Sequence, residues 1–216
     1  MASGTRSPAE GSRSSTLDVF ARVEARQGRE RALAAVLVEH LPAVRLTPGC
    51  LLVHDYRSIR DARLLYVHSR WSDLESFERY ACSPETDRFV HEAEEHMASP
   101  PLRAIRTVAL EPDPAAAVPV GELTVFAPFR ARAGEQLGVE QALRSVHAAT
   151  AREPGCLAHR ICRSVGEAAL FYVHSIWTSE EAFEQHAAQA HTTHFIEQVE
   201  PLIDHALEVT RACRIG

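Results

Sequence analysis

The stretch RSIRDARLLYVHSRW at Arg57–Trp71 returns as RSVGEAALFYVHSIW at Arg163–Trp177, a shift of 106 positions. The same shift places the turn Pro48-Gly49-Cys50-Leu51 on Pro154-Gly155-Cys156-Leu157 without a gap. Self-similarity at one fixed spacing indicates an internal duplication. The chain is therefore predicted to consist of two copies of one domain.

The domain boundaries follow from the ends of the repeat. Prolines and small residues fill the segment EPDPAAAVPV between the copies, which is typical of a stiff, non-helical connector. The start of the chain, MASGTRSPAEGSRSST, contains arginines and serines and lacks the apolar stretch of about 7–15 residues that a secretory signal needs. We expect a disordered tail at 1–16, a first copy at 17–110, a linker at 111–120 and a second copy at 121–216.

Each copy shows the same order of hydrophobic periodicities. In the first copy, these patterns predict a strand, a helix, a two-stranded hairpin, a second helical stretch and a last strand, at 17–23, 33–41, 50–57 with 64–71, 73–89 and 102–110. The second copy repeats the order, with its last strand at 206–213. The result is βαββαβ twice.

The strand that ends at Trp71 needs cover on both faces. Tyr66 and His68 point one way, whereas Val67, Ser69 and Trp71 point the other. An antiparallel sheet with both helices on one side leaves its other face apolar and uncovered. We therefore expect an α+β fold in which the two sheets pack face to face within one chain, as in a homodimer whose subunits have been fused.

Composition excludes several classes of function. The net charge is −6 and no run of basic residues occurs, so nucleic acid is not an expected partner. All 23 basic residues are arginine, which excludes a lysine Schiff base and a Walker lysine. No apolar run is long enough for a membrane span or a secretory signal, so we expect a cytoplasmic protein without a membrane partner.

The Pro-Gly-Cys turns, the aromatic-rich strand ending at Trp177 and the segment EEAFEQHAAQAHTTHF together resemble antibiotic-biosynthesis-monooxygenase domains. The resemblance covers both copies. It implies ferredoxin-like βαββαβ units that pair into a dimeric α/β barrel, here as a tandem fusion, with a pocket between the helices and the sheet of each unit. The activities it implies are cofactor-free oxygenation of polycyclic phenols to quinones, quinol oxidation and oxidative haem opening.

The resemblance also assigns roles to positions. Trp71 and Trp177 match the family tryptophan at the end of the third strand, and His186 and His191 match the family's helical histidines. The first copy has Tyr80 and Glu85 at those two helical positions. The chemistry is therefore expected in the second copy, with the first serving mainly as scaffold.

Three departures from the family pattern bear on mechanism. Ser69 and Ser175 replace the glutamate that many members carry two residues before the tryptophan. The quinone-forming and haem-degrading branches both use an asparagine, and this sequence contains none. A haem-ligating histidine expected after the second helical phenylalanine is replaced by Ala93 and Val199.

The candidate catalytic residues are His186, His191 and Trp177. A histidine with a pKa near neutrality can deprotonate a phenol, and the tryptophan can form an apolar wall beside it. The candidate substrate-binding residues are Trp71, Phe183, Phe195, His174 and His194. Other interpretations stay open, since the histidines could line a solvated helix face or share a metal ion and the tryptophans could be core. No metal is expected, because no third ligand stands at a fixed spacing.

Three functions are compatible with these residues. The first is a cofactor-independent monooxygenase that oxidises a polycyclic phenol or quinol with O₂, in antibiotic or polyketide tailoring. The second is a non-catalytic barrel that binds a hydrophobic aromatic molecule or acts as a scaffold, and the third is a haem-binding protein. The expected partners are a small aromatic molecule and O₂, without a cofactor, in a pseudo-dimeric chain that can pair further as a homodimer.

Overall fold

The computed structural model of the chain describes residues 16–100, 102–111 and 120–216. The expected tail at 1–16 and linker at 111–120 lie almost wholly outside the described residues, so both stay predictions. Among the helices of the described part, none is sufficiently long and apolar to cross a bilayer. The five cysteines are free.

The predicted βαββαβ order is confirmed in both copies. The first copy comprises β1 (Leu17–Glu24), α1 (Glu30–Arg45), β2 (Cys50–Ser58), β3 (Leu64–Trp71), α2 (Leu74–Ala81), α3 (Pro84–Glu94) and β4 (Ala104–Ala109). The second comprises β5 (Leu123–Arg130), α4 (Gln136–Thr150), β6 (Cys156–Ser164), β7 (Leu170–Trp177), α5 (Glu180–Ala187), α6 (Ala190–Val199), the 3-10 turn η1 (Glu200–Leu202) and β8 (Thr210–Arg214).

The second helical stretch of each copy is two helices, so the expectation of one continuous helix was wrong. In the first copy the break falls at Ser83, which has an extended backbone because the next residue is Pro84. The second copy keeps the break at Gln189, with φ −70° and ψ 145°, although Ala190 follows. His186 therefore lies on α5, whereas His191 and His194 lie on α6.

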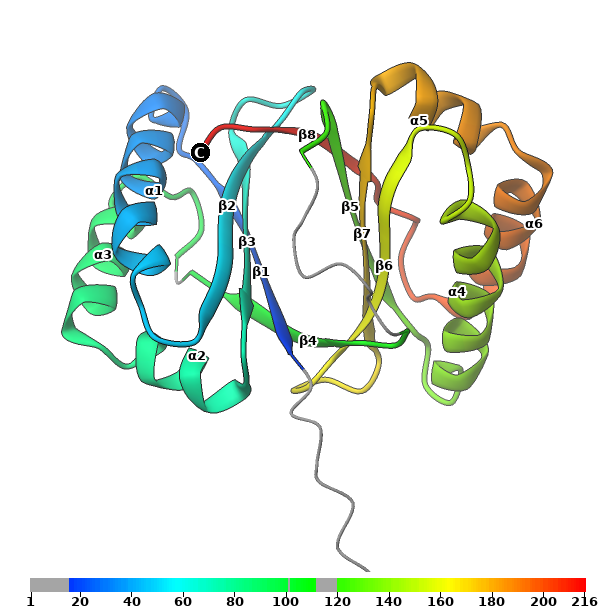
Figure 1. Cartoon of the computed structure of the whole chain (residues 1–216), viewed down its shortest axis with the longest axis horizontal. Helices are drawn as coiled ribbons and strands as arrows, with labels where there is room; N and C mark the ends of the chain where they lie inside the picture. The colour runs from blue at the N-terminus through cyan, green and yellow to red at the C-terminus, as the bar shows by residue number, and fades with distance from the viewer. Residues whose placement is uncertain (1–15, 101, 112–119) are drawn as a thin grey trace, which may run out of the picture.

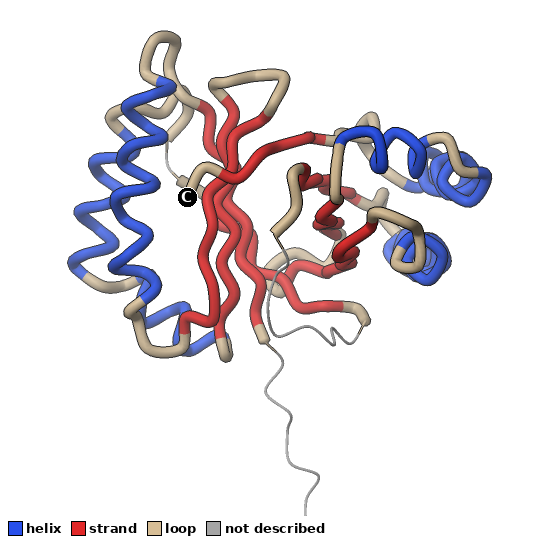
Figure 2. Tube along the Cα trace, turned by 45° about the horizontal axis from the view of Figure 1, so that its top comes forward, coloured by secondary structure: helices blue, strands red, loops and turns tan. Residues whose placement is uncertain are grey.

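The eight strands close into one barrel in the order β1-β3-β2-β8-β5-β7-β6-β4. The last strand of each copy joins the two sheets, because β4 pairs with β1 and β6, and β8 pairs with β5 and β2. Figure 1 shows α1 to α3 covering one side of the barrel and α4 to α6 covering the other. Figure 2 shows the same helix layers outside the strands. The predicted face-to-face packing of two sheets within one chain is confirmed, and the eight described strands leave no sheet edge open.

Alternation along β3 and β7 separates two layers. Val67, Ser69 and Trp71 face the helices, while Tyr66 and His68 face the barrel interior. In the second copy, Val173 and Trp177 face the helices and pack in their hydrophobic clusters. Any pocket between helix and sheet is thereby separated from the barrel interior by a strand layer.

The barrel interior is partly ionic, which corrects the expectation of a wholly apolar inner face. Asp18 is fully buried there, and one of its oxygens lies 2.7 Å from Nε2 of His68 and 3.1 Å from Nε of Arg70. Arg160 reaches across from the second copy to the same carboxylate at 3.3 Å. Burial alone raises the pKa of Asp18, but hydrogen bonds and charge from His68 and Arg70 outweigh it and hold that pKa below its usual value.

Two glycines fix the turn that precedes β2 and β6. Gly49 and Gly155 have φ of +89° and +85°, a region that favours glycine. A Cβ atom on Gly155 would lie 2.6 Å from Cβ of Ala182, and one on Gly49 would lie 2.4 Å from Cβ of Ser76. The turns therefore pack closely on α2 and α5, which bring Tyr80 and His186 to the helix–sheet layer.

Candidate functional site

The first copy contains a narrow apolar cavity of about 70 Å³ between α1, α2, α3 and the sheet. Aliphatic and aromatic side chains from all of these elements form most of its wall: Val19, Ala21, Leu37, Leu41, Val44, Val53, Val67, Phe77, Phe89, Leu102 and Ala104. Four polar side chains complete the wall: Asp55, His40, Ser69 and Tyr80. An apolar space with few polar groups is the usual character of a small-molecule site.

Asp55 supplies the one carboxyl group among the described residues of this cavity wall. It stands on β2 on the face turned to the helices, is 1% exposed, and its Oδ2 atom has no hydrogen-bond partner. Burial raises the pKa of Asp55 to about 7, and the charge of Arg45 opposes this shift only in part. A carboxyl group of this kind exchanges a proton near neutral pH, as a general base requires.

His40 and Tyr80 stand between the cavity and the surface. Nε2 of His40 lies 3.1 Å from the Tyr80 hydroxyl, and its ring stacks on Phe89 with centroids 3.9 Å apart. Burial lowers the pKa of His40, which keeps the imidazole neutral. The same two side chains line an outer groove of about 370 Å³, formed with Thr47, Ser76, Arg79 and Glu85 among others.

Trp71 supports this site from behind. Its ring is fully buried and stacks on Tyr80 with centroids 4.9 Å apart, and its indole N–H donates to Oγ of Ser69 at 3.0 Å. Trp177 makes the equivalent bond to Ser175 at 2.9 Å. The serine that replaces the family glutamate thus accepts a hydrogen bond from the indole N–H in both copies.

The corresponding layer of the second copy has different chemistry. Ile161 stands where the first copy has Asp55, and Val146 stands where it has His40. Two histidines face each other instead, with Nδ1 of His147 and Nδ1 of His159 3.0 Å apart. Burial lowers the pKa of His159 to about 3, which keeps its ring neutral. One of the two Nδ1 atoms can therefore donate its N–H to the other.

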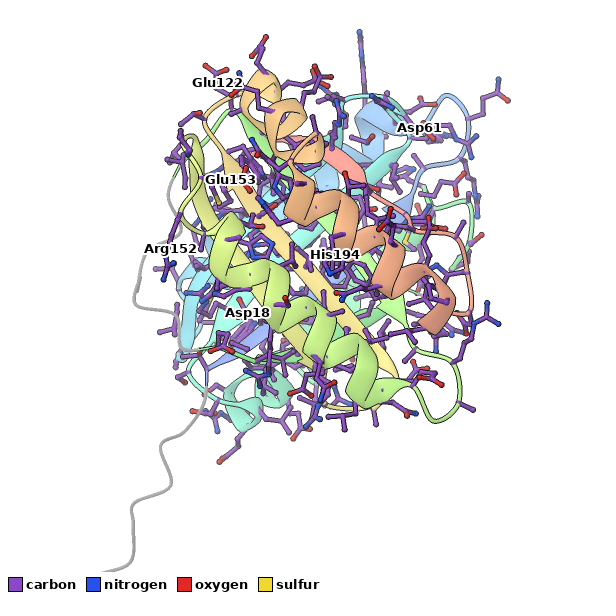
Figure 3. The ribbon with its side chains drawn as sticks, turned by 90° about the vertical axis from the view of Figure 1, so that its right-hand side faces the viewer. Asp18, Asp61, Glu122, Arg152, Glu153 and His194 are labelled. Atoms are coloured by element: carbon purple, nitrogen blue, oxygen red, sulfur yellow. The ribbon has the colours of Figure 1, made fainter. Side chains whose placement is uncertain are left out.

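A carboxylate joins the two predicted catalytic histidines. Oε1 of Glu153 lies 2.7 Å from Nδ1 of His186 and 2.8 Å from Nε2 of His191. Glu153 belongs to the turn after α4, and Figure 3 shows it at the end of that helix, with His194 farther along α6. The ring of His186 also lies 4.8 Å from the ring of Trp177. The structure therefore brings His186, His191 and Trp177 together, and their catalytic role stays a prediction.

The model of the family described as antibiotic biosynthesis monooxygenase matches residues 17–92 and, a second time, residues 123–198. The chain belongs to the antibiotic biosynthesis monooxygenase family. The two matched ranges are offset by the same 106 positions as the sequence repeat, so each copy is one domain of the family.

Solved structures share the whole two-copy fold of this family member. A candidate monooxygenase of Fusobacterium nucleatum superposes with a TM-score of 0.74 at 10% identity, covering 94% of each chain. An anthrone oxidase-like protein gives 0.73 at 18% identity over 94% of this chain and 92% of its own. A candidate monooxygenase of Lactobacillus acidophilus superposes with a TM-score of 0.67 at 11% identity, covering 93% of this chain and 94% of its own. No curated protein matches the chain.

The remaining candidate residues of the second copy of this family member do not form one site. Phe183 packs on Trp177 with ring centroids 5.6 Å apart, and Phe195 packs on Phe129 within the core of the second copy. His174 is fully buried inside the barrel, on the opposite face of β7 from Trp177, with both ring nitrogens lacking a hydrogen-bond partner. His194 is exposed. Nε2 of His68, the counterpart of His174 in the first copy, lies 2.7 Å from Oδ1 of Asp18.

The haem-ligand position of this family member is closed by apolar side chains. Ala93 and Val199 are both fully buried and carry no ligating atom. The structure thus agrees with the departure seen in the sequence.

Three residues of these candidate sites were missed by sequence reasoning. Asp55 and His40 each stand at a position that the second copy fills with an aliphatic residue, and this contrast was the available signal. Glu153 precedes the Pro-Gly-Cys turn and is distant in sequence from both histidines, so only the fold brings it to them.

Proposed function

We propose that the chain is a cofactor-independent monooxygenase that oxidises a phenolic or quinol-type aromatic molecule with O₂, and that the reaction takes place in the cavity of the first copy. The observation that carries this proposal is Asp55, a buried carboxyl group with a pKa raised to about 7 in the wall of an apolar cavity. Such chemistry needs a base and an apolar space, and Asp55 and the cavity wall provide them.

The base starts the reaction. The substrate carries a reactive ring methylene in its keto form and a hydroxyl group in its phenol form. The Asp55 carboxylate removes the proton of the phenol form, and the resulting anion transfers one electron to O₂. The substrate radical and superoxide then combine at the ring carbon, and the Asp55 carboxyl group returns its proton to the peroxide. Loss of water from the hydroperoxide leaves a carbonyl group. The sum is CH₂ + O₂ → C=O + H₂O, so no reductant is needed.

The size of the site restricts how a substrate binds. The cavity of about 70 Å³ is smaller than the roughly 150 Å³ in which a benzene ring is held in an engineered protein cavity. An aromatic substrate therefore has to displace the side chains of His40 and Tyr80 and to extend into the outer groove of about 370 Å³. The rings of Phe77, Phe89 and Tyr80 then supply stacking surfaces.

The relatives support the class of reaction. The family carries monooxygenase in its name, and one protein that shares the whole fold is described as anthrone oxidase-like. Anthrone is the keto tautomer of a tricyclic phenol and carries one reactive methylene group. This structure fits the chemistry proposed for Asp55. A role in tailoring an aromatic antibiotic or polyketide is part of this proposal.

The test uses purified full-length protein and anthrone as the probe. Quinone formation is followed by absorbance, and consumption of O₂ is followed with an electrode. The proposal predicts enzyme-dependent formation of anthraquinone with one O₂ consumed per product, and one atom of ¹⁸O from ¹⁸O₂ in the new carbonyl group. Binding of anthrone without turnover would replace this proposal by the non-catalytic aromatic-binding function, which the same apolar cavity favours.

A further inference from the structure

The second copy places potential metal ligands at five positions where the first copy has none or has only an exposed carboxylate. The shift of 106 positions pairs Leu41, Thr47, Val53, Tyr80 and Glu85 with His147, Glu153, His159, His186 and His191. These substitutions lie on the helix–sheet layer and the turn beside it, while the core aromatics Phe77 and Phe89 keep their counterparts Phe183 and Phe195. Divergence between the copies has therefore concentrated nitrogen and oxygen donors in one place.

We propose that Glu153, His186 and His191 bind a divalent transition-metal ion of the zinc class. The donor atoms offered by these three side chains all lie within 4.8 Å of one another. Two imidazoles and one carboxylate form a donor set that suits such an ion, and three protein ligands leave a coordination position for water. The third ligand is the one that sequence spacing did not reveal.

The hydrogen bonds in the cluster already hold the donors in position. Oε1 of Glu153 lies 2.7 Å from His186 and 2.8 Å from His191, and the ion would take the place of the protons in these two bonds. Ligand bonds of about 2.0–2.1 Å in a tetrahedral site set the donors about 3.3 Å apart. The two contacts to Glu153 thus need to lengthen by only a fraction of an ångström, and the two histidine nitrogens already lie within 4.8 Å of each other.

Three separate elements orient the donors. His186 lies near the end of α5 against the ring of Trp177, and the hydroxyl of Thr192 lies 3.3 Å from its Nδ1 atom. His191 lies in the first turn of α6, and Glu153 lies in the turn fixed by Gly155. The side chains of Glu153 and His186 are each 12% exposed and that of His191 is 30% exposed. An ion can therefore reach the site from solvent through the side of His191.

The test is a titration of full-length, tag-free, chelator-treated protein with Zn²⁺ by calorimetry, and with Co²⁺ by visible absorption. We expect one tight Zn²⁺ site per chain and d–d bands from Co²⁺ that Zn²⁺ displaces. His191→Ala and Glu153→Gln each change a ligand and should weaken this binding by at least about 100-fold, because loss of an outer-shell partner alone costs about 10–100-fold. The matched control is His194→Ala, on the same helix but exposed, which should bind Zn²⁺ as the unchanged protein does.

Circular dichroism of each variant shows whether it is folded, and His191→Gln serves in place of His191→Ala if the latter is not. Absence of saturable binding in the unchanged protein would overturn the proposal. Binding that His191→Ala and Glu153→Gln leave intact would overturn it as well, because the ion would then be held elsewhere. The readout does not involve turnover in the first copy, so this proposal and the proposed function stand or fall separately.

Discussion

The Nε2 atom of His40 lies 3.1 Å from the hydroxyl of Tyr80, and these two side chains form both the outer wall of the first-copy cavity and the floor of the groove beside it. The contact joins α1 to α2 in the first copy. The second copy has Val146 and His186 at these positions and cannot make it. Each copy has therefore kept the fold while placing different polar groups between helix and sheet.

Filling the cavity should block the site without harming the fold. Ala21→Leu adds three carbon atoms to the cavity wall, so we expect unchanged or slightly higher stability, by up to about 1 kcal/mol, and loss of anthrone binding. Ala127→Leu is the matched control, because Ala127 lies at the equivalent position in a packed core and overpacking there costs about 1–3 kcal/mol. Urea unfolding and fluorescence titration measure the two effects. Anthrone binding retained in Ala21→Leu would place the site elsewhere.

The buried carboxyl group of Asp55 should make stability depend on pH. Its pKa is raised from 3.8 to about 7 on folding, so the folded protein holds the proton more tightly and loses stability as pH rises between these values. Asp55→Asn removes this dependence. The free energy of unfolding of the variant, relative to that of the unchanged protein, should rise by up to about 1.4 kcal/mol per pH unit between pH 4 and 7. Above pH 7 this difference should stay constant. Parallel stability curves for the two proteins would contradict the raised pKa.

The ionic cluster inside the barrel should be needed for stability. Asp18→Asn removes the negative charge that Arg70 and Arg160 share, and breaking a buried ion pair costs about 3–5 kcal/mol. The exposed Asp87→Asn should change stability by less than about 0.5 kcal/mol. Because the pKa of Asp18 is lowered on folding, the difference between Asp18→Asn and the unchanged protein should shrink only below about pH 3.8. Chemical unfolding at pH 7 and pH 3 checks both statements.

The Pro-Gly-Cys turn should tolerate no side chain. Gly155→Ala combines a positive φ with a Cβ contact of 2.6 Å to Ala182, whereas Gly134→Ala combines a similar φ of +88° with no atom within 4 Å. The backbone cost of about 1–2 kcal/mol applies to both, and only Gly155→Ala adds a steric clash. We expect the first variant to lose at least about 1 kcal/mol more than the second in thermal unfolding. Equal losses would mean that α5 moves freely away from the turn.

The order of elements and the pairing of two sheets could be predicted from the sequence, because both depend on local periodicity and on a gap-free repeat. The positions of β4 and β8 between the sheets could not, since no local pattern states which edge a last strand will join. Gln189 shows a second limit. Its extended backbone separates α5 from α6 within a segment whose sequence pattern predicts one continuous helix. In the first copy, Pro84 is a sequence signal for the equivalent break.

The candidate site was harder to predict than the fold. His186 and His191 could be selected because the family resemblance marked them, but their carboxylate partner Glu153 reaches them only through the turn after α4. Asp55 reads as a polar residue in an alternating strand, and nothing in the strand itself shows that its carboxyl group is buried beside a cavity. The buried ionic contacts of Asp18 could not be predicted either, because its partners Arg70 and Arg160 lie on other strands.

The most direct test of the account compares the rate of anthraquinone formation at pH 8 in the unchanged protein, Asp55→Asn and His186→Ala. We expect Asp55→Asn to lose about 100-fold or more in turnover, as removal of a general base does, while His186→Ala in the second copy keeps most of it. Full activity of a folded Asp55→Asn together with loss of activity in His186→Ala would contradict the account and place the reaction in the second copy.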